Sequence, residues 1–341
     1  MEERIEDIAQ AMVQSGQGIL AADESTATIG KRFDSINVEN VEANRQAYRE
    51  MLFRSSTAME KYISGVIMFE ETLFQKAVDG TPFVDLIRNA GAVPGIKVDM
   101  GAHALAGHPG EKVTEGLDGM RDRLKKYYEA GARFAKWRAV IAIDDELPTL
   151  GGIKANAHAL ARYASLCQEA GIVPIVEPEV LMDAEPAVHS IERCHEATSA
   201  VLQSVFEELN EQQVLLEGMI LKPNMIVPGI NAERQADAEE IAAHTVSVLM
   251  RSVPAAVPGI AFLSGGQSDE DATANLNAMN ANYDLPWAVT YSYGRALQAA
   301  CLKAWNGSAD CVAAGEAAFT HRAKMNSLAS LGEYDPGMET A

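Results

Sequence analysis

Eight short runs rich in β-branched residues recur along the 341-residue chain, and most are followed by a longer amphipathic stretch. This alternation is typical of βα units, in which crossover helices join parallel strands. Eight such units are the number that closes a parallel sheet into a barrel. The runs cover residues 18–23, 64–69, 95–99, 134–141, 172–180, 219–223, 260–266 and 287–294.

We therefore predict an α/β protein with a single (β/α)8 TIM barrel over residues 1–341, including a short C-terminal tail at 335–341. No low-complexity or linker-like stretch divides the chain. The alternative is a doubly wound open sheet. It is less favoured because the first run continues as ADESTATIG, where a dinucleotide-binding sheet would carry GxGxxG.

Charge and hydropathy argue against several kinds of partner. The chain has 28 basic and 48 acidic residues, and its net charge of −20 opposes non-specific attraction to nucleic acid or anionic lipid. No apolar run approaches the roughly 18 residues of a membrane span. The four cysteines form no CxxC pair, which fits a reducing cytoplasm. The seven histidines form no HxH or HExxH motif, so we predict no metal site.

Charged residues occur in pairs near the ends of three predicted strands. Because alternate strand residues share a face, Lys136 and Arg138 point to one side of the strand and Trp137 to the other. An acidic pair, Glu177 and Glu179, has the same spacing one strand later. Lys97 and Asp99 repeat it on the third strand. A barrel interior accepts such charges only when they lie close to one another. The alternative for any one pair is an ion pair that only closes the barrel mouth.

Lys222 has apolar neighbours in GMILKPNMI, and Pro223 favours an extended backbone there. Burial and the neighbouring cation Lys136 would both lower the pKa of this lysine. A lowered pKa exposes the free amine that attacks a carbonyl carbon to form a Schiff base. The alternative is a solvated lysine at the barrel rim.

Glycines end the seventh and eighth strands, in FLSGGQS and YSYGR. Barrels of this class frequently bind phosphate at this position through backbone N–H groups, and Arg295 would add a bidentate positive charge. The alternative is that these are ordinary turn glycines. The predicted phosphate site contains Ser264, Gly265, Gly294 and Arg295.

Seven ordered segments closely resemble the class I, Schiff-base-forming fructose-bisphosphate aldolases. They are GILAADESTATIGKRF, GIKVD, FAKWR, IVPIVEPEV, LLEGMILKPNM, FLSGGQS and PWAVTYSYGRALQAACLKAW, and the similarity runs from about residue 8 to residue 334. The resemblance implies a cytoplasmic, metal-independent lyase that needs no cofactor. Such an enzyme cleaves fructose 1,6-bisphosphate reversibly into dihydroxyacetone phosphate and glyceraldehyde 3-phosphate, in glycolysis and gluconeogenesis. A homotetramer is implied by the resemblance alone.

The resemblance also implies a role for each site residue. Lys222 would form the Schiff base, and Glu177 would accept and donate protons during imine formation. Glu179 would orient the lysines, Lys136 would stabilise developing negative charge, and Asp23 would take the hydroxyl proton whose loss drives carbon–carbon cleavage. One phosphate would be held by Ser264, Gly265, Gly294 and Arg295, and the other by Lys97, Arg138, Ser25, Thr28 and Arg32.

The sequence departs from the family pattern at Thr28, at Met100, where a lysine is common, and at the C-terminal end. Thr28 stands where many members have serine, which keeps the hydroxyl. Many members also carry a flexible tail that ends in tyrosine and reaches the site, whereas here DPGMETA follows Tyr334. We expect this segment, which contains Pro336 and Gly337, to be mobile and too short to cross the barrel mouth.

Two other functions are compatible with these residues. One is another Schiff-base barrel enzyme, such as a transaldolase or an aldolase for a singly phosphorylated sugar. Two basic phosphate clusters favour a bisphosphate over this alternative. The other is a non-catalytic barrel that binds sugar phosphates or partner proteins. The joint presence of Lys222, Glu177, Lys136 and Asp23 favours an enzyme over a binding protein.

Overall fold

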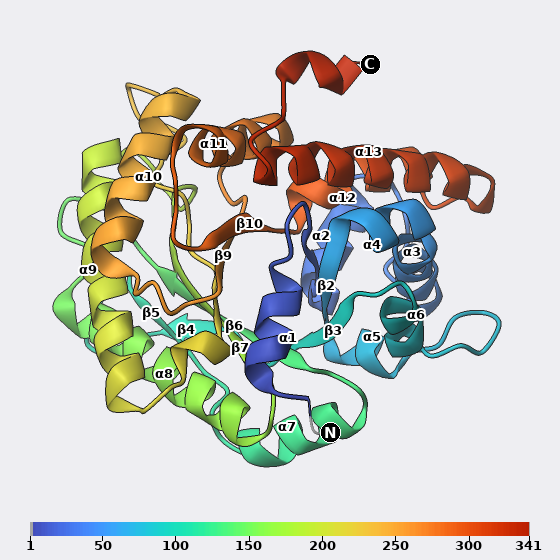
Figure 1. Ribbon diagram of the computed structural model, residues 1–341, viewed down its shortest axis with the longest axis horizontal. Helices are drawn as coiled ribbons and strands as arrows, with labels where there is room; N and C mark the ends of the chain where they lie inside the picture. The colour runs from blue at the N-terminus through green and yellow to red at the C-terminus, as the bar shows by residue number, and fades with distance from the viewer. Residues whose placement is uncertain (1–2, 341) are drawn as a thin grey trace.

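The eight predicted runs form the parallel strands of one closed barrel in a computed structural model that describes residues 3–340. Neighbouring strands follow the order β1-β10-β9-β8-β7-β6-β3-β2 around the barrel, which confirms the predicted TIM barrel and excludes the open sheet. Figure 1 shows the helices arranged around it. The barrel strands are β1 (Gly18–Ala22), β2 (Ile63–Met68), β3 (Val93–Lys97), β6 (Phe134–Ile141), β7 (Val173–Val180), β8 (Ile220–Leu221), β9 (Gly259–Phe262) and β10 (Ala288–Tyr293).

Several helices begin at a side chain that caps them. Ser25, Ser190 and Ser268 each accept a hydrogen bond from the backbone N–H three residues later, which satisfies a donor that the first turn leaves free. The helices are α1 (Ile5–Met12), α2 (Thr26–Asp34), α3 (Glu42–Arg54), α4 (Ser56–Tyr62), α5 (Glu70–Phe74), α6 (Phe83–Asn89), α7 (Met120–Glu129), α8 (Leu150–Glu169), α9 (Ile191–Glu211), α10 (Ala238–Ser252), α11 (Asp269–Asn282), α12 (Arg295–Trp305) and α13 (Val312–Ser330). A hairpin of β4 (Ala102–Ala104) and β5 (Lys112–Thr114) and three short 3₁₀ helices (Leu216–Gly218, Ala309–Cys311 and Pro336–Thr340) complete the fold.

The larger of two apolar cores lies between the strands and the surrounding helices. Trp137 of β6 belongs to it, and its ring stacks on that of Tyr163 of α8 with 5.6 Å between centroids. This contact confirms that Trp137 faces the helix layer. The residues on either side of Trp137, Lys136 and Arg138, lie on the opposite face of β6, toward the barrel interior, where they line the cavity described below.

The smaller core fills the lower half of the barrel, where α1 closes the N-terminal end. Ile8 and Met12 of α1 pack with inward-facing strand residues such as Phe134, Ile175 and Ile220. This plug makes one end of the barrel dry and apolar, so a substrate can enter only from the other end. Figure 1 shows α1 lying across the barrel.

Each of three strands changes from apolar to charged along the same inward face. Two residues beyond Phe134, Ile175 and Ile220 stand Lys136, Glu177 and Lys222, and all three charged side chains are at least nine-tenths buried. The same two-residue alternation that places the apolar side chains in the lower core therefore places the charged ones just above it. The fold positions the candidate site in this way.

Gly95 of β3 shows how tightly the lower core is packed. A Cβ atom at this position would lie 2.2 Å from the ring of Phe134, a separation that real side chains essentially never show. The absence of a side chain at Gly95 is what allows the Phe134 ring to fill the narrow interior.

The C-terminal segment differs from the mobile tail that we expected. Residues Pro336–Thr340 form a 3₁₀ turn, and the carboxylate of Glu339 accepts a hydrogen bond from the hydroxyl of Tyr334 at 3.0 Å. Glu339 also forms an ion pair with Arg322 of α13, with 2.5 Å between Nη1 and Oε1. These contacts hold the turn against the helix layer. None of the helices in the described part of the chain is long and apolar enough to span a membrane.

Candidate active site

A cavity of about 660 Å³ opens at the C-terminal ends of the barrel strands. Its size suits a small phosphorylated substrate, since ligand pockets usually measure roughly 300–1,000 Å³. Every residue that the sequence predicted for the site lines this cavity: Asp23, Ser25, Thr28, Arg32, Lys97, Lys136, Arg138, Glu177, Glu179, Lys222, Ser264, Gly265, Gly294 and Arg295.

Lys222 stands at the floor of the cavity, directly after β8. Its backbone N–H donates to the carbonyl of Val176 at 2.8 Å, which extends the pairing of β8 with β7 by one residue. Its side chain is 4% exposed, and its Nζ lies 3.1 Å from Oε1 of Glu177. Strand pairing therefore fixes the backbone of Lys222, and the carboxylate of Glu177 contacts its amine.

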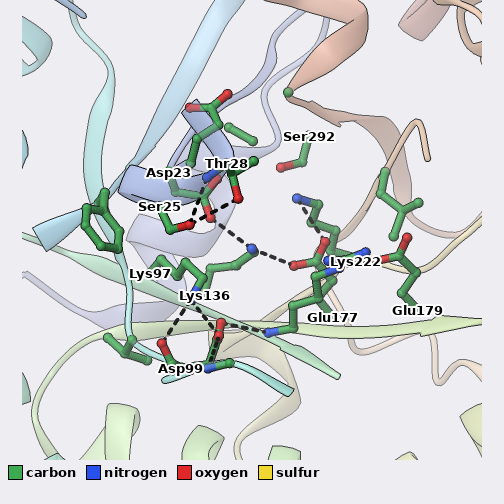
Figure 2. Close-up of a pocket in the computed structure, with 18 of the residues that line it drawn as sticks. Asp23, Ser25, Thr28, Lys97, Asp99, Lys136, Glu177, Glu179, Lys222 and Ser292 are labelled. Atoms are coloured by element: carbon green, nitrogen blue, oxygen red, sulfur yellow. Dashed lines mark hydrogen bonds and ion pairs between the residues drawn. The ribbon is translucent and has the colours of Figure 1, made fainter. Parts of the chain in front are cut away.

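Lys136 lies between two carboxylates, as Figure 2 shows. Its Nζ donates to Oδ2 of Asp23 at 2.9 Å and lies 3.1 Å from Oε2 of Glu177. Glu177 thus contacts both lysines, one through each oxygen. Its Oε2 has no hydrogen-bond partner within the described residues, although the ion-pair contact with Lys136 remains. That oxygen keeps a free lone pair at the cavity floor.

Burial and neighbouring charges shift the pKa values of these four groups in different directions. Burial lowers the pKa of Lys222, and the charge of Lys136 lowers it further, against the opposing effect of Glu177. Burial acts to lower the pKa of Lys136 too, but Asp23 and Glu177 together outweigh it and raise that pKa. Lys222 is therefore the easier of the two amines to deprotonate, whereas Lys136 stays a cation.

The two carboxylates stay ionised although they are buried. Burial alone would raise the pKa of Asp23, but Lys136 and Lys222 lower it to about 2. The same balance of burial against Lys136 and Lys222 lowers the pKa of Glu177. The site therefore holds two lysine nitrogens and two carboxylates that are joined by direct contacts.

A second layer of ion pairs surrounds this centre. Arg138 forms an ion pair with Glu179, which is 3% exposed. Lys97 Nζ lies 2.6 Å from Oδ1 of Asp99, and Oδ2 of Asp99 accepts a hydrogen bond from the backbone N–H of Arg138 at 3.3 Å. The shared-face pairs predicted from the sequence are thus brought together at the barrel mouth.

The N-terminus of α2 contributes hydroxyl groups and one further cation. The hydroxyls of Ser25 and Thr28 lie 3.0 Å apart, and Ser25 also caps the helix. Arg32, one turn further along, pairs with Glu24 at 2.5 Å. A helix N-terminus with exposed hydroxyls and a nearby guanidinium favours anion binding at this edge of the cavity.

The opposite edge is built from the ends of β9 and β10. Gly266 has a φ of 71°, a left-handed conformation that favours glycine, and it follows Ser264 and Gly265 in a tight turn. Arg295 begins α12, and its Nη2 donates to the carbonyl of Gln267 at 2.9 Å. The side chain of Arg295 is therefore held against the turn whose backbone lines the cavity.

Sequence reasoning missed Glu24, which is 7% exposed and also lines the cavity. Its carboxylate contacts Arg32, Arg49 at 3.2 Å and the side-chain amide of Gln298 at 3.0 Å. It follows Asp23 directly in ADES, which is the one signal that could have drawn attention to it. Among residues 3–340, no three His, Cys, Asp or Glu side chains are grouped in a way that could hold a metal ion.

Comparison with known proteins identifies the family. The family described as "Fructose-bisphosphate aldolase class-I" matches residues 4–341. The chain belongs to this family. It is 57% identical over 320 residues to a protein named "Fructose-bisphosphate aldolase 4, cytosolic" from Arabidopsis thaliana, covering 94% of this chain and 80% of the relative.

Two further relatives cover nearly their full length. The chain is 54% identical over 333 residues to a "Probable fructose-bisphosphate aldolase class 1" from Xanthomonas campestris pv. campestris, covering 97% of this chain and 98% of the relative. The solved structure of fructose-bisphosphate aldolase from Plasmodium falciparum, in complex with TRAP and a small-molecule inhibitor, superposes with a TM-score of 0.94 at 50% identity. That match covers 98% of this chain and 95% of the other. The chain is therefore a class I fructose-bisphosphate aldolase, a lyase of glycolysis, as its resemblance implied.

Proposed function

We propose that Lys222 is the amine on which this aldolase forms its Schiff base with fructose 1,6-bisphosphate. The observation that carries this assignment is the environment of Lys222. Its amine is buried, its pKa is lowered, and its Nζ lies 3.1 Å from a carboxylate that can move protons. A neutral amine in contact with a proton carrier is what nucleophilic attack on a ketone requires.

Imine formation needs two proton transfers at one place. When the Lys222 amine attacks the ketone carbon, the nitrogen loses protons and the former carbonyl oxygen gains them until it leaves as water. Glu177 contacts Lys222 with one oxygen and has a free lone pair on the other. We assign it both transfers, because one carboxyl can accept a proton from nitrogen and return it to oxygen.

Carbon–carbon cleavage then follows from the positive charge of the iminium. A base removes the proton from the hydroxyl on the fourth carbon, the bond between the third and fourth carbons breaks, and its electron pair moves into the iminium to give a neutral enamine. We assign the base to Asp23 and stabilisation of developing negative charge to Lys136, which touches it at 2.9 Å. Proton transfer to the enamine and hydrolysis of the resulting imine release dihydroxyacetone phosphate and free Lys222.

The two edges of the cavity would hold the two phosphates. We assign one to Ser264, Gly265, Gly294 and Arg295, and the other to Lys97, Arg138, Ser25, Thr28 and Arg32. Glu179 would keep Arg138 in place through their ion pair, in addition to its expected role of orienting the lysines. Cation and hydroxyl groups on both sides support a substrate with a phosphate at each end.

Cleavage of the bisphosphate by purified protein tests this assignment. We expect Lys222→Met to abolish cleavage of fructose 1,6-bisphosphate and Lys154→Met, a change of an exposed lysine on α8, to leave it unchanged. Equal kcat/KM for fructose 1-phosphate and the bisphosphate would favour an aldolase for singly phosphorylated sugars. Full activity of Lys222→Met would refute the Schiff-base assignment.

We also propose that the protein acts in the cytoplasm as a homotetramer that binds no nucleic acid. The location is supported by the printed name of the Arabidopsis relative. The tetramer rests on the family resemblance. Light scattering of the purified protein measures the mass directly, and a monomer mass of 36.6 kDa would refute the tetramer.

A further inference from the structure

Arg322 is a buried arginine outside the cavity, on the inner side of α13. It is 4% exposed, and its guanidinium finds four acceptors. Nε donates to the carbonyl of Ala296 at 3.3 Å, and Nη1 donates to Glu339 at 2.5 Å. Nη2 donates to the carbonyl of Asp269 at 2.8 Å and to the hydroxyl of Thr273 at 2.6 Å.

These acceptors lie on three different segments. Asp269 is the first residue of α11, Ala296 is the second residue of α12, and Glu339 belongs to the C-terminal turn. Figure 1 shows α11, α12, α13 and the C-terminus gathered on one side of the barrel. One planar guanidinium therefore fixes two helix N-termini relative to each other, which a lysine with a single nitrogen cannot reproduce.

The two helix N-termini are those next to the proposed phosphate subsite. The turn of Ser264 and Gly265 leads into α11 through Gln267, and Arg295 directly precedes Ala296. Arg295 Nη2 donates to the carbonyl of Gln267 at 2.9 Å, so the residue that begins α12 already contacts the segment that leads into α11. Arg322 contacts the N-termini of the same two helices, α11 and α12, from outside the cavity.

We propose that Arg322 is a positioning residue for the phosphate subsite formed by Ser264, Gly265 and Arg295, an inference that rests on the proposed function of that subsite. Arg322 sets the spacing between the backbone of the turn and the guanidinium of Arg295. Glu339 keeps Arg322 in place because it is the carboxylate that neutralises its buried charge. The C-terminal turn thus contributes to phosphate affinity without reaching the cavity.

The test compares dihydroxyacetone phosphate with dihydroxyacetone, two ketones that differ only in the phosphate group. Borohydride reduces the Schiff base and inactivates the enzyme, so the ketone concentration that gives half-maximal inactivation reports binding. We expect Arg322→Lys to raise this concentration about tenfold for dihydroxyacetone phosphate and to leave it unchanged for dihydroxyacetone. The KM for fructose 1,6-bisphosphate should rise similarly, with kcat within about twofold.

Two further variants separate positioning from a general loss of structure. Glu339→Gln keeps the backbone contacts of Arg322 and should give the same selective effect at a smaller size. Arg121→Lys changes an exposed arginine that pairs with Glu169, and it should affect neither ketone. Thermal unfolding identifies any variant that does not fold. If Arg322→Lys does not fold, the effect of Glu339→Gln on the half-maximal concentrations of the two ketones tests the proposal instead.

The outcomes separate the inference from the function on which it rests. Equal effects on both ketones, or no effect from either Arg322→Lys or Glu339→Gln, would overturn the inference alone. If Arg295→Ala also leaves the half-maximal concentration of dihydroxyacetone phosphate unchanged, the subsite assignment fails, and the inference fails with it. A selective loss for the phosphorylated ketone in all three variants supports both.

Discussion

Replacing Lys136 by methionine removes the cation that lies between Asp23 and Glu177. The expected rate loss is roughly 100-fold or more in kcat, the size seen when a preorganised electrostatic group is removed. Methionine has a similar length and no charge, so the change leaves the cavity shape nearly intact. Two effects act together, because Lys136 both stabilises developing charge and lowers the pKa of Lys222.

The same substitution should destabilise the fold. The pKa of Asp23 is lowered from 3.8 to about 2, and each pKa unit corresponds to about 1.36 kcal/mol. Ionised Asp23 therefore stabilises the fold by about 2 kcal/mol above pH 3.8, and this contribution is lost as the pH falls through 2. Without Lys136, the two buried carboxylates lose the cation that contacts both of them, and only the more distant charges of Lys97 and Arg138 remain beside Lys222. This loss should cost about 3–5 kcal/mol at pH 7.

Steady-state kinetics across pH 5–9 measure the rate loss, and denaturant unfolding over the same range measures the loss of stability. We expect the acid limb of the rate profile to move to higher pH, because the pKa of Lys222 rises when Lys136 no longer opposes its protonation. We also expect the stability loss to shrink at lower pH, as the unpaired carboxylates take up protons. Lys154→Met is the matched control. A kcat within threefold of the original chain and an unmoved profile would refute this account of Lys136.

Three other predictions follow from single contacts. Arg295→Ala should raise KM for the bisphosphate and leave kcat nearly unchanged, since phosphate anchoring acts in ground and transition states alike; a loss of kcat alone would mean the role is wrong. Incubation with EDTA should leave the cleavage rate unchanged, and a loss that zinc restores would contradict a metal-independent enzyme. Gly95→Ala should lower the free energy of unfolding by roughly 1–3 kcal/mol, because its Cβ would lie 2.2 Å from the Phe134 ring; denaturant unfolding with no change would contradict this packing.

The barrel and the floor of the site could be predicted because strand alternation is a local rule. Spacing of two residues is enough to place Lys136 and Arg138 on one face and Trp137 on the other, and the structure agrees. The apolar surroundings of Lys222 likewise predicted its burial and the direction of its pKa shift.

The contacts that the sequence did not predict join segments far apart in the chain. Glu24 meets Gln298 of α12 because the barrel closes between β1 and β10, the strand that leads into α12, and it also meets Arg49 of α3. The tail was expected to be mobile from its short length and its Pro and Gly, yet Glu339 forms an ion pair with Arg322 in the middle of α13. No periodic pattern marks such a pair, because its two members come together only through tertiary packing.

Reduction of the Schiff base tests the central claim most directly. The purified chain is treated with borohydride in the presence of dihydroxyacetone phosphate and then digested for peptide mass mapping. The account predicts irreversible inactivation and added mass on the peptide that contains Lys222, with none on the peptide that contains Lys136. Added mass at another lysine, or full activity after treatment, would contradict it.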